Sequence, residues 1–402
     1  MTRCLLRALP VLPTTEPVID KELRVVLSAN AHPGVGGQGL NLAHMMEAYA
    51  GAALATFCRG RGAPPDVVGV PELKVQGLMS RVPLVNRRMD LLTLVSDVQF
   101  DRHVARHLGN VDLFQGAVGQ AATSLRRARE LGVPTVLDVV NTHVDDFAVH
   151  VERECKKFGV RPFIHPAMRW RIRREYERAT IIRVMSDTAR RTFLERGVSP
   201  DRVFTATPPC DVEGSPVAAH DDPVFRVGFV GLVAPWKGFH YLVDAFDRAA
   251  LRESELVLWG GTGNRGTSQW LKRKMAANDR IVLRPQSVRA LGFAEVYGAM
   301  SVLVHPSLAD GFAYVVAEAM GCGVPVIVTS NTGAADLVVE GVNGYVVPPG
   351  DADAIADRLR FLASHRSLIP KMGAEARLAA RRLTRDRFRQ QLLEPALAIT
   401  RR

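Results

Sequence analysis

The stretch of sequence that decides the fold runs from residue 301 to residue 328 and reads SVLVHPSLADGFAYVVAEAMGCGVPVIV. Its pattern predicts a strand over 301–305, a loop, a helix with a glycine stop, and a second strand over 324–328. A strand, a helix and a further strand form the repeating unit of a parallel sheet. The carboxyl ends of the strands and the free amides at the start of the helix form a crevice suited to an anion such as phosphate.

Short Val/Ile/Leu-rich runs alternate with longer amphipathic segments through most of the chain, which predicts an α/β fold class with two Rossmann-like parallel sheets. Thr207–Pro223 has four prolines and no apolar periodicity, as is typical of a linker. We therefore expect two domains, residues 1–212 and 213–402, with the last helix packing back on the first domain. The other expected strands are Leu23–Ala29, Leu54–Cys58, Val111–Gln115, Pro134–Val139, Thr180–Met185, Phe225–Val230, Glu255–Trp259 and Arg280–Arg284.

The composition limits the class of protein. The chain has 402 residues, with Lys+Arg 52 against Asp+Glu 41, and the formal net charge of +11 favours an anionic partner. The five cysteines include no C-x-x-C pair, so neither a disulfide framework nor a zinc ribbon is indicated. No apolar run approaches the roughly 18 residues of a membrane span, and the first residues do not have the pattern of a signal peptide. We expect a cytoplasmic protein.

The positive charge is concentrated in residues 151–200, which hold thirteen Lys/Arg and six Asp/Glu. Two interpretations stay open: a solvated helical face, or a segment that docks peripherally onto an anionic membrane or a lipid-linked acceptor. Nucleic acid is not indicated, because the segment lacks the interleaved aromatic residues of a stacking platform. The apolar residues that favour membrane docking are Phe158, Phe163, Ile164, Met168, Trp170 and Ile172.

Two acidic residues belong to the predicted loop and helix of the deciding stretch. Asp310 stands at the start of the helix, and Glu318 follows eight residues later among apolar neighbours. A carboxylate in such surroundings is costly unless something donates a hydrogen bond to it, and the hydroxyl groups of a sugar are suitable donors. The alternative is an ordinary exposed glutamate with Asp310 as a helix cap.

A lysine follows the first strand of the second sheet. FVGLVAPWKGFHYLVDAF at residues 229–246 places Gly231 at the end of a strand, where a backbone can approach a ligand closely, and Lys237 where the next helix begins. This puts a cation at an expected phosphate site. The loops WGGTGN at 259–264 and RPQS at 284–287 follow the next two strands and are expected to approach a base and a ribose.

These residues resemble the retaining glycosyltransferases of family 4, which have the GT-B fold. The resemblance is strongest from Phe225 to about Leu359 and weaker over the first 210 residues. The family's E-x7-E element corresponds to Asp310 through Glu318, with the shorter Asp in the first place. Further similarity lies in GVPV at 323–326, TGAADL at 332–337 and EGVNGYVVPPGD at 340–351.

The resemblance implies roles for the matching positions of the second domain. Lys237 and the amides near Gly311 and Phe312 would bind the donor diphosphate, Asp310 the hydroxyls of the donor sugar, and Glu318 the ribose. Gly231 would allow close approach of the donor.

One departure concerns the donor diphosphate. The family usually carries Gly-Arg-Leu where this chain has Gly231 and Leu232, so the arginine that pairs the diphosphate is absent.

In the first domain, HPGVGGQGLNL at 32–42 looks like the glycine-rich loop that faces the donor across the cleft, which implies a role for Gly36 and Gly37. VNTHVDD at 140–146 follows a predicted strand, and its His143 resembles the cleft histidine that meets the donor sugar. The alternative is a structural histidine in a loop.

Taken together, the resemblance implies an enzyme that transfers a sugar from a nucleotide-sugar donor to a glycan, a lipid-linked molecule or a small acceptor, with retention of anomeric configuration. No cofactor and no metal are expected: Asp351-Ala352-Asp353 spells D-x-D, but Asp351 is better placed to cap a helix. The alternatives are a sugar phosphorylase or epimerase of the same fold, or a catalytically degenerate nucleotide-binding subunit of a polysaccharide assembly complex.

Overall fold

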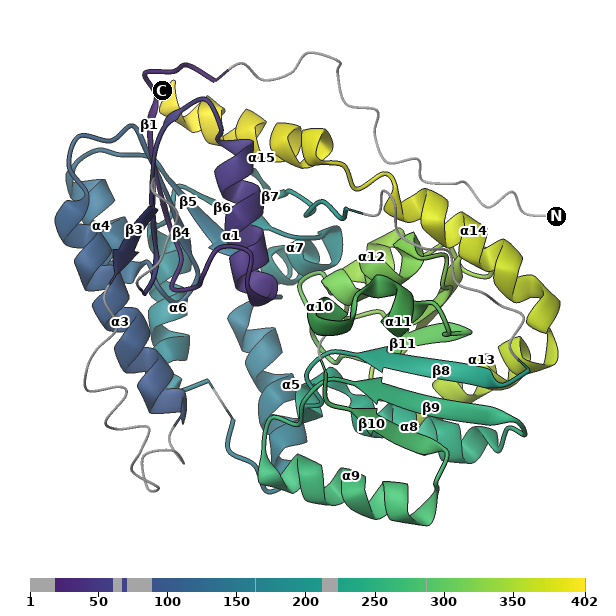
Figure 1. Ribbon diagram of the computed structural model, residues 1–402. Coiled ribbons are helices and arrows are strands. Elements are labelled where there is room, and N and C mark those ends of the chain that lie inside the picture. Colours follow the sequence, from purple (N-terminus) through teal and green to yellow (C-terminus); the bar gives the residue numbers. More distant parts are fainter. Residues whose placement is uncertain are drawn as a thin grey trace.

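The computed structural model describes residues 19–60, 67–70, 89–162, 164–211, 223–286 and 288–401. These residues form two parallel sheets that lie side by side, each flanked by helices (Figure 1). The predicted α/β class with two Rossmann-like sheets is therefore confirmed. The boundary expected between residues 212 and 213 lies outside the described residues.

The first sheet has seven strands in the order β3-β2-β1-β4-β5-β6-β7. Its strands are β1 Arg24–Ser28, β2 Ala53–Arg59, β3 Val67–Val70, β4 Leu113–Ala117, β5 Thr135–Val139, β6 Ile181–Val184 and β7 Val203–Thr205. The helices of this domain are α1 Gly36–Ala48, α3 Met89–His107, α4 Ala122–Glu130, α5 Val144–Lys157, α6 Pro166–Arg178 and α7 Asp187–Leu194. β3 and β7 lie at the two edges of the sheet and were not expected from the sequence.

The second sheet has six strands in the order β10-β9-β8-β11-β12-β13. They are β8 Phe225–Val230, β9 Ser254–Trp259, β10 Ile281–Arg284, β11 Val302–His305, β12 Val326–Thr329 and the unexpected edge strand β13 Gly344–Val347. The helices are α8 Phe239–Ala249, α9 Arg265–Ala277, α10 Val288–Leu291, α11 Phe293–Tyr297, α12 Tyr314–Gly321, α13 Ala352–Ser364 and α14 Ile369–Ala380. α8 and α9 cover one face of this sheet, and α11 and α12 cover the other (Figure 1).

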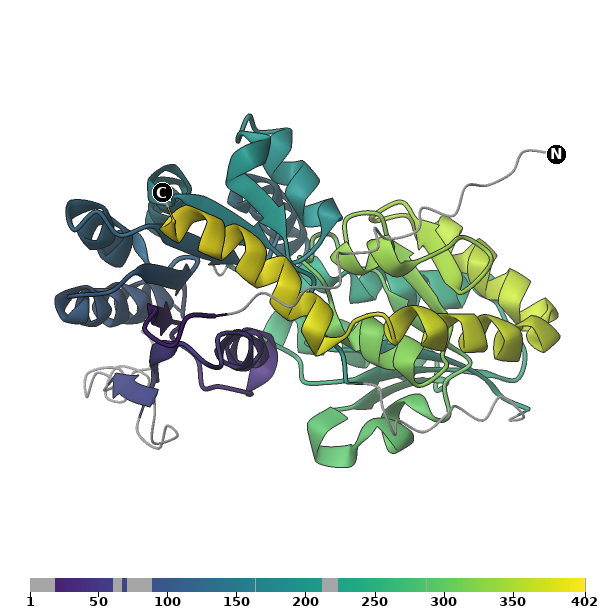
Figure 2. The same ribbon diagram turned by 90° about the horizontal axis from the view of Figure 1, so that it is seen from above.

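The last helix, α15 Arg385–Thr400, runs back from the second domain to the first (Figure 2). Its buried side chains Phe388 and Leu392 belong to the same apolar cluster as Leu42 and Met45 of α1. The Arg389 guanidinium donates a 2.7 Å hydrogen bond to the carbonyl of Ala48. α15 therefore ties the C-terminal part of the chain to the first sheet.

The basic segment packs within the protein. Phe158 lies in ring contact with Phe239 and Trp270 of the second domain, at 5.7 Å in each case. Met168 is buried, and Ile164 and Ile172 pack against apolar clusters. The Trp170 side chain is exposed, at 60%, and Phe163 lies outside the described residues. Apart from Trp170 and Phe163, these apolar residues pack within the protein, so they give little support to membrane docking.

Four of the five arginines of α6 are engaged in ion pairs. Arg169 and Arg173 bind Asp145 at 2.5 and 2.7 Å, and Arg174 binds Glu177 at 2.8 Å. Arg171 binds the buried Asp101. Among the described residues, no helix is both long and apolar enough to cross a membrane.

Candidate active site

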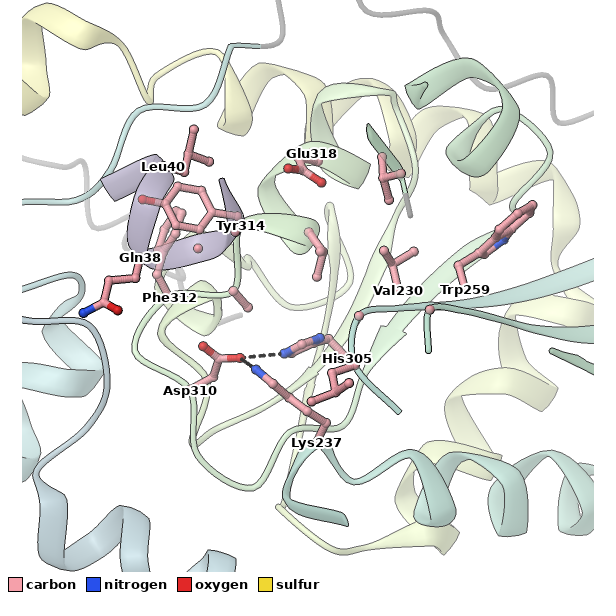
Figure 3. A pocket seen from close by; sticks show the side chains of 18 of the residues that line it. Gln38, Leu40, Val230, Lys237, Trp259, His305, Asp310, Phe312, Tyr314 and Glu318 are labelled. Atoms are coloured by element: carbon pink, nitrogen blue, oxygen red, sulfur yellow. Dashed lines mark hydrogen bonds and ion pairs between the residues drawn. The ribbon is translucent and has the colours of Figure 1, made fainter. Parts of the chain in front are cut away.

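A cleft of about 740 Å³ opens between the carboxyl ends of the two sheets (Figure 3). Strands β5, β8, β9 and β11 all end at it, as expected for the crevice of a parallel sheet. The first domain contributes Val35, Gly36, Gly37, Gln38, Leu40, Val140 and Met185. The second contributes Val230, Gly231, Leu232, Lys237, Trp259, Gly260, Gly261, Gln286, Val288, His305, Asp310, Phe312, Ala313, Tyr314, Val315 and Glu318.

Asp310 is the centre of a polar cluster on the wall of this cleft (Figure 3). Its Oδ2 atom accepts hydrogen bonds from the Lys237 ammonium and, at 3.1 Å, from Nε2 of His305. Burial would raise the pKa of Asp310, but Lys237 and His305 outweigh that effect and hold the pKa well below its usual range. Asp310 is therefore an anion whose position is determined by two neighbouring side chains.

A close backbone approach brings Lys237 to Asp310. Gly238, which follows the lysine, has φ of +69°, and a Cβ atom there would lie 2.0 Å from the carbonyl oxygen of Pro306. The amide of Leu308 also donates a 3.0 Å hydrogen bond to the carbonyl of Trp236. The loop after β8 therefore packs directly on the loop after β11, and a glycine is required at the contact.

Glu318 lines the cleft from α12, one side of which is buried in the second domain. Its Oε2 atom accepts a 2.7 Å hydrogen bond from the hydroxyl of Tyr297, a fully buried residue of α11. Burial, together with the Glu318 carboxylate, raises the pKa of Tyr297. The sequence predicted that a sugar would donate a hydrogen bond to this carboxylate, and in the structure the Tyr297 hydroxyl donates one.

The first domain faces this cluster with the start of α1. Gly36 and Gly37 open that helix and line the cleft, as expected. The residue before them, Val35, makes no side-chain cap hydrogen bond to the helix. Amides at an uncapped helix N-terminus favour an anion, so both walls of the cleft offer positive potential.

The structure does not bring His143 into the cleft. Its imidazole accepts a 3.2 Å hydrogen bond from the amide of Asp145 at the start of α5, and its ring packs 4.9 Å from Tyr176 and 5.1 Å from Phe193. Val140, at the end of β5, lines the cleft instead. The correction has a simple reason: the chain turns away from the cleft within three residues of the strand end, so His143 points into the first domain.

Gly311 holds the domains together and is not among the residues that line the cleft. A Cβ atom at Gly311 would lie 2.1 Å from the carbonyl oxygen of Val140 in the first domain. The carbonyl of Gly311 accepts a 2.7 Å hydrogen bond from the hydroxyl of Ser186, also in the first domain. The next residue, Phe312, does line the cleft, as does Gly231.

Several lining residues were not singled out from the sequence. His305 reads as the last residue of an apolar strand, and Tyr314 as an ordinary helix residue. The loops expected near a base and ribose do reach the cleft, through Trp259 and Gln286. Among the described residues that line it, Lys237 is the one lysine or arginine, and Leu232, with 45% of its surface exposed, stands where the family resemblance expects an arginine.

The described residues include no group of three or more His, Cys, Asp or Glu side chains placed to hold a metal ion. Asp351 caps α13 by accepting a 2.9 Å hydrogen bond from the amide of Ala354, and Asp353 binds Arg248 at 2.8 Å. The expectation that Asp351 is a helix cap is therefore confirmed.

Comparison with known proteins finds a family match for part of the second domain. Residues 224–365 match the model of the family described as glycosyl transferases group 1. The capsular polysaccharide biosynthesis glycosyltransferase CapM of Staphylococcus aureus is 32% identical over 158 residues, which are 38% of this chain and 40% of that protein. A D-inositol 3-phosphate glycosyltransferase of Xylanimonas cellulosilytica is 32% identical over 178 residues, or 43% of this chain and 42% of its own. The chain thus matches less than half the length of either protein.

Other similarities extend over most of the chain. A D-inositol 3-phosphate glycosyltransferase of Thermobifida fusca is 26% identical over 388 residues, which are 85% of this chain and 84% of that protein. The crystal structure of Anabaena HepE in complex with UDP superposes with a TM-score of 0.70 at 17% identity, covering 94% of this chain and all of HepE. Sucrose-phosphate synthase from Thermosynechococcus elongatus gives a TM-score of 0.66 at 18% identity, covering 94% and 98%. Residues 224–365 therefore match the family of glycosyl transferases group 1, and the chain as a whole has the GT-B fold of the solved glycosyltransferase structures.

Proposed function

We propose that this protein transfers a sugar from a nucleotide-sugar donor to a hydroxyl group of an acceptor, with retention of anomeric configuration. The observation that carries the proposal is the meeting of Lys237, Asp310 and Glu318 at one cleft, in the domain that matches the family. The acceptor is a glycan, a lipid-linked molecule or a small molecule. The family match, the fold and the names of the relatives support this proposal.

The chemistry follows from the charges at the cleft. As the sugar leaves, the diphosphate gains negative charge, so a cation beside it stabilises the transition state more than the ground state. Lys237 and the amides at the start of α1 supply that positive potential. Asp310 offers a carboxylate to the hydroxyls of the sugar, and Glu318 offers one to the ribose. Retention follows when the acceptor hydroxyl attacks the face of the sugar that the diphosphate leaves and gives its proton to the departing diphosphate.

We further propose that transfer needs no metal ion, because Lys237 carries the charge that a divalent cation would otherwise supply. Turnover should persist in EDTA. Loss of activity on chelation, with recovery on addition of Mg²⁺ or Mn²⁺ alone, would contradict this part of the proposal.

The experiment has two steps. Thermal unfolding is first measured with UDP, GDP, ADP and their sugars, since a ligand that binds the native state raises the melting temperature. The donor selected is then incubated with acceptors, nucleotide release is measured, and the anomeric configuration of the product is read by NMR. A product of inverted configuration contradicts retention. Sugar transfer to inorganic phosphate in place of a hydroxyl acceptor identifies a phosphorylase, and isomerisation of the donor sugar identifies an epimerase.

The degenerate subunit remains the second candidate, because Leu232 occupies the place of an expected arginine and Lys237 is the one lysine or arginine among the described lining residues. This candidate predicts a raised melting temperature with a nucleotide but no release of nucleotide from any donor. Introducing the arginine, Leu232→Arg, should then increase the affinity for the nucleoside diphosphate.

Peripheral contact with an anionic membrane rests on charge alone, because most of the apolar residues of the basic segment pack inside the protein. Co-sedimentation with neutral and anionic vesicles tests it. Equal recovery with the two kinds of vesicle would exclude such contact.

A further inference from the structure

We propose that His305 is a positioning residue that holds Asp310 in the orientation needed to receive the donor sugar. This inference rests on the proposed function and adds a residue that the sequence did not single out. His305 ends β11 and is buried, and its ring stacks on that of Phe229 with centroids 6.5 Å apart and planes 8° from parallel. Its Nε2 atom lies 3.1 Å from Oδ2 of Asp310 (Figure 3).

The surroundings of the two ring nitrogens of His305 show which of them carries the proton. The other ring nitrogen, Nδ1, is buried without a hydrogen-bond partner. A protonated Nδ1 would leave an unsatisfied donor in the core, so the proton belongs on Nε2, which donates it to Asp310. Burial also lowers the pKa of His305, although the Asp310 carboxylate opposes that shift. His305 is therefore a neutral donor whose ring is held by packing.

The same carboxylate oxygen also binds Lys237, and this sharing explains why a second anchor is needed. A diphosphate attracts the Lys237 ammonium and so weakens its hold on Asp310. His305 also lines the cleft, but its side chain is only 3% exposed and its Nε2 atom is directed at Asp310, so an incoming donor competes little for its proton. Asp310 thus keeps one oxygen fixed by His305 while the other is free to accept a hydrogen bond from the sugar.

Two substitutions at His305 separate the hydrogen bond from the packing. His305→Phe keeps an aromatic ring against Phe229 and removes the donor, whereas His305→Gln removes the ring and places an amide N–H near the position of Nε2. We expect His305→Phe to lower kcat/KM for the nucleotide-sugar 10- to 100-fold and to leave the affinity for the corresponding nucleoside diphosphate, which has no sugar, within threefold. His305→Gln should recover most of the lost kcat/KM.

A double-substitution cycle shows whether His305 acts through Asp310. In an Asp310→Ala background, His305→Phe should reduce kcat/KM by less than threefold further, because the group that it positions is gone. Independent, multiplicative losses would mean that His305 matters for another reason and would overturn the inference. If the melting temperature of His305→Phe is well below that of the wild type, His305→Asn replaces it in the cycle. The asparagine amide is too short to reach Asp310, so this variant also removes the donor.

The outcomes for the two proposals differ. A wild-type protein that transfers sugar, with His305→Phe within twofold of it, overturns this inference alone. A wild-type protein that transfers no sugar from any donor overturns the proposed function, and this inference with it.

Discussion

Asp310 illustrates how single residues of this protein depend on partners that are distant in sequence. Its carboxylate binds Lys237, which lies 73 residues earlier, and His305, which lies five residues earlier in the preceding strand. An aspartate this deeply buried is tolerated because both partners stabilise its charged form. The two residues both line the cleft but differ in accessibility, since the Lys237 side chain is 25% exposed and the His305 side chain is 3% exposed.

Lys237→Ala should lower kcat at least as much as it raises KM for the donor, because the charge on the leaving diphosphate is greatest in the transition state. The loss of one charge-assisted hydrogen bond is worth about 1.5 to 3 kcal/mol. Steady-state kinetics measure both constants. Lys274→Ala is the matched control: Lys274 on α9 binds Asp244 on α8 at 2.8 Å and does not line the cleft, so its removal should leave the kinetics unchanged. Wild-type rates in Lys237→Ala with folding intact would refute the assignment.

Glu318→Ala should chiefly weaken binding of the donor, because the carboxylate is assigned to the ribose, which does not react. Calorimetry with the nucleoside diphosphate measures this directly. Tyr297→Phe is the companion variant, since it removes only the hydroxyl that donates to Glu318 at 2.7 Å. It should weaken nucleotide binding less than Glu318→Ala does. An unchanged nucleotide affinity in Glu318→Ala would place the ribose elsewhere.

At the scale of elements, the start of α12 contains an unusual backbone conformation. Ala313 precedes the helix with φ of +68° and ψ of +76°, in the left-handed region that favours glycine. Both neighbours of Ala313, Phe312 and Tyr314, line the cleft. The strained residue thus determines how the loop carrying Asp310 enters the helix carrying Glu318.

Ala313→Gly should stabilise the protein by up to about 1 kcal/mol. Left-handed backbone costs alanine about 1 to 2 kcal/mol, and the greater flexibility of glycine in the unfolded chain returns about 0.5 to 1 kcal/mol of that. Chemical denaturation measures the difference. Ala317→Gly, in the middle of the same helix and with no positive φ, is the control and should destabilise the protein. Destabilisation by both substitutions would show that the strain is not released.

At the scale of the whole molecule, polar contacts hold the two domains together. The buried carboxylate of Glu154 on α5 accepts hydrogen bonds from His240 at 3.0 Å and Tyr241 at 3.2 Å, both on α8 of the other domain. Asp336 of the second domain accepts hydrogen bonds from the amides of Asp187 and Thr188 at the start of α7. These contacts join α5 and α7 of the first domain to the second domain.

Glu154→Gln should reduce the stability of the protein at neutral pH and flatten its loss in acid. Burial raises the pKa of Glu154, but hydrogen bonds from His240, Lys157 and Arg153 outweigh it and bring the pKa to about 2, from an ordinary 4.5. A lowered folded-state pKa gives stability that is present above pH 4.5 and is lost as the pH falls towards 2, by up to about 3 kcal/mol.

Thermal unfolding between pH 3 and pH 7 checks this prediction. The difference between the wild type and Glu154→Gln should be largest near neutral pH and should shrink below pH 4.5. Glu152→Gln, on the same helix with its side chain exposed, is the control and should follow the wild-type profile. A constant difference at all pH values would mean that the charge of Glu154 does not contribute.

The sequence by itself determined the two parallel sheets and much of the cleft. Apolar runs predict the central strands because both faces of those strands are buried, whereas β3, β7 and β13 are short edge strands with weak patterns. Lys237 and Asp310 were predicted because each follows a strand whose carboxyl end must face the crevice. Local periodicity and strand direction are properties of the chain that need no tertiary information.

Only the tertiary structure decided which polar side chains face one another. His305 ends one apolar strand and His143 follows another, yet His305 binds Asp310 while His143 packs on Tyr176, because a side chain's direction near a strand end depends on the path of the next few residues. Phe158 among basic residues is compatible with a membrane or with a core, and its contact with Phe239 and Trp270 depends on how the second domain docks. Such contacts join residues far apart in the chain, and no local pattern encodes them.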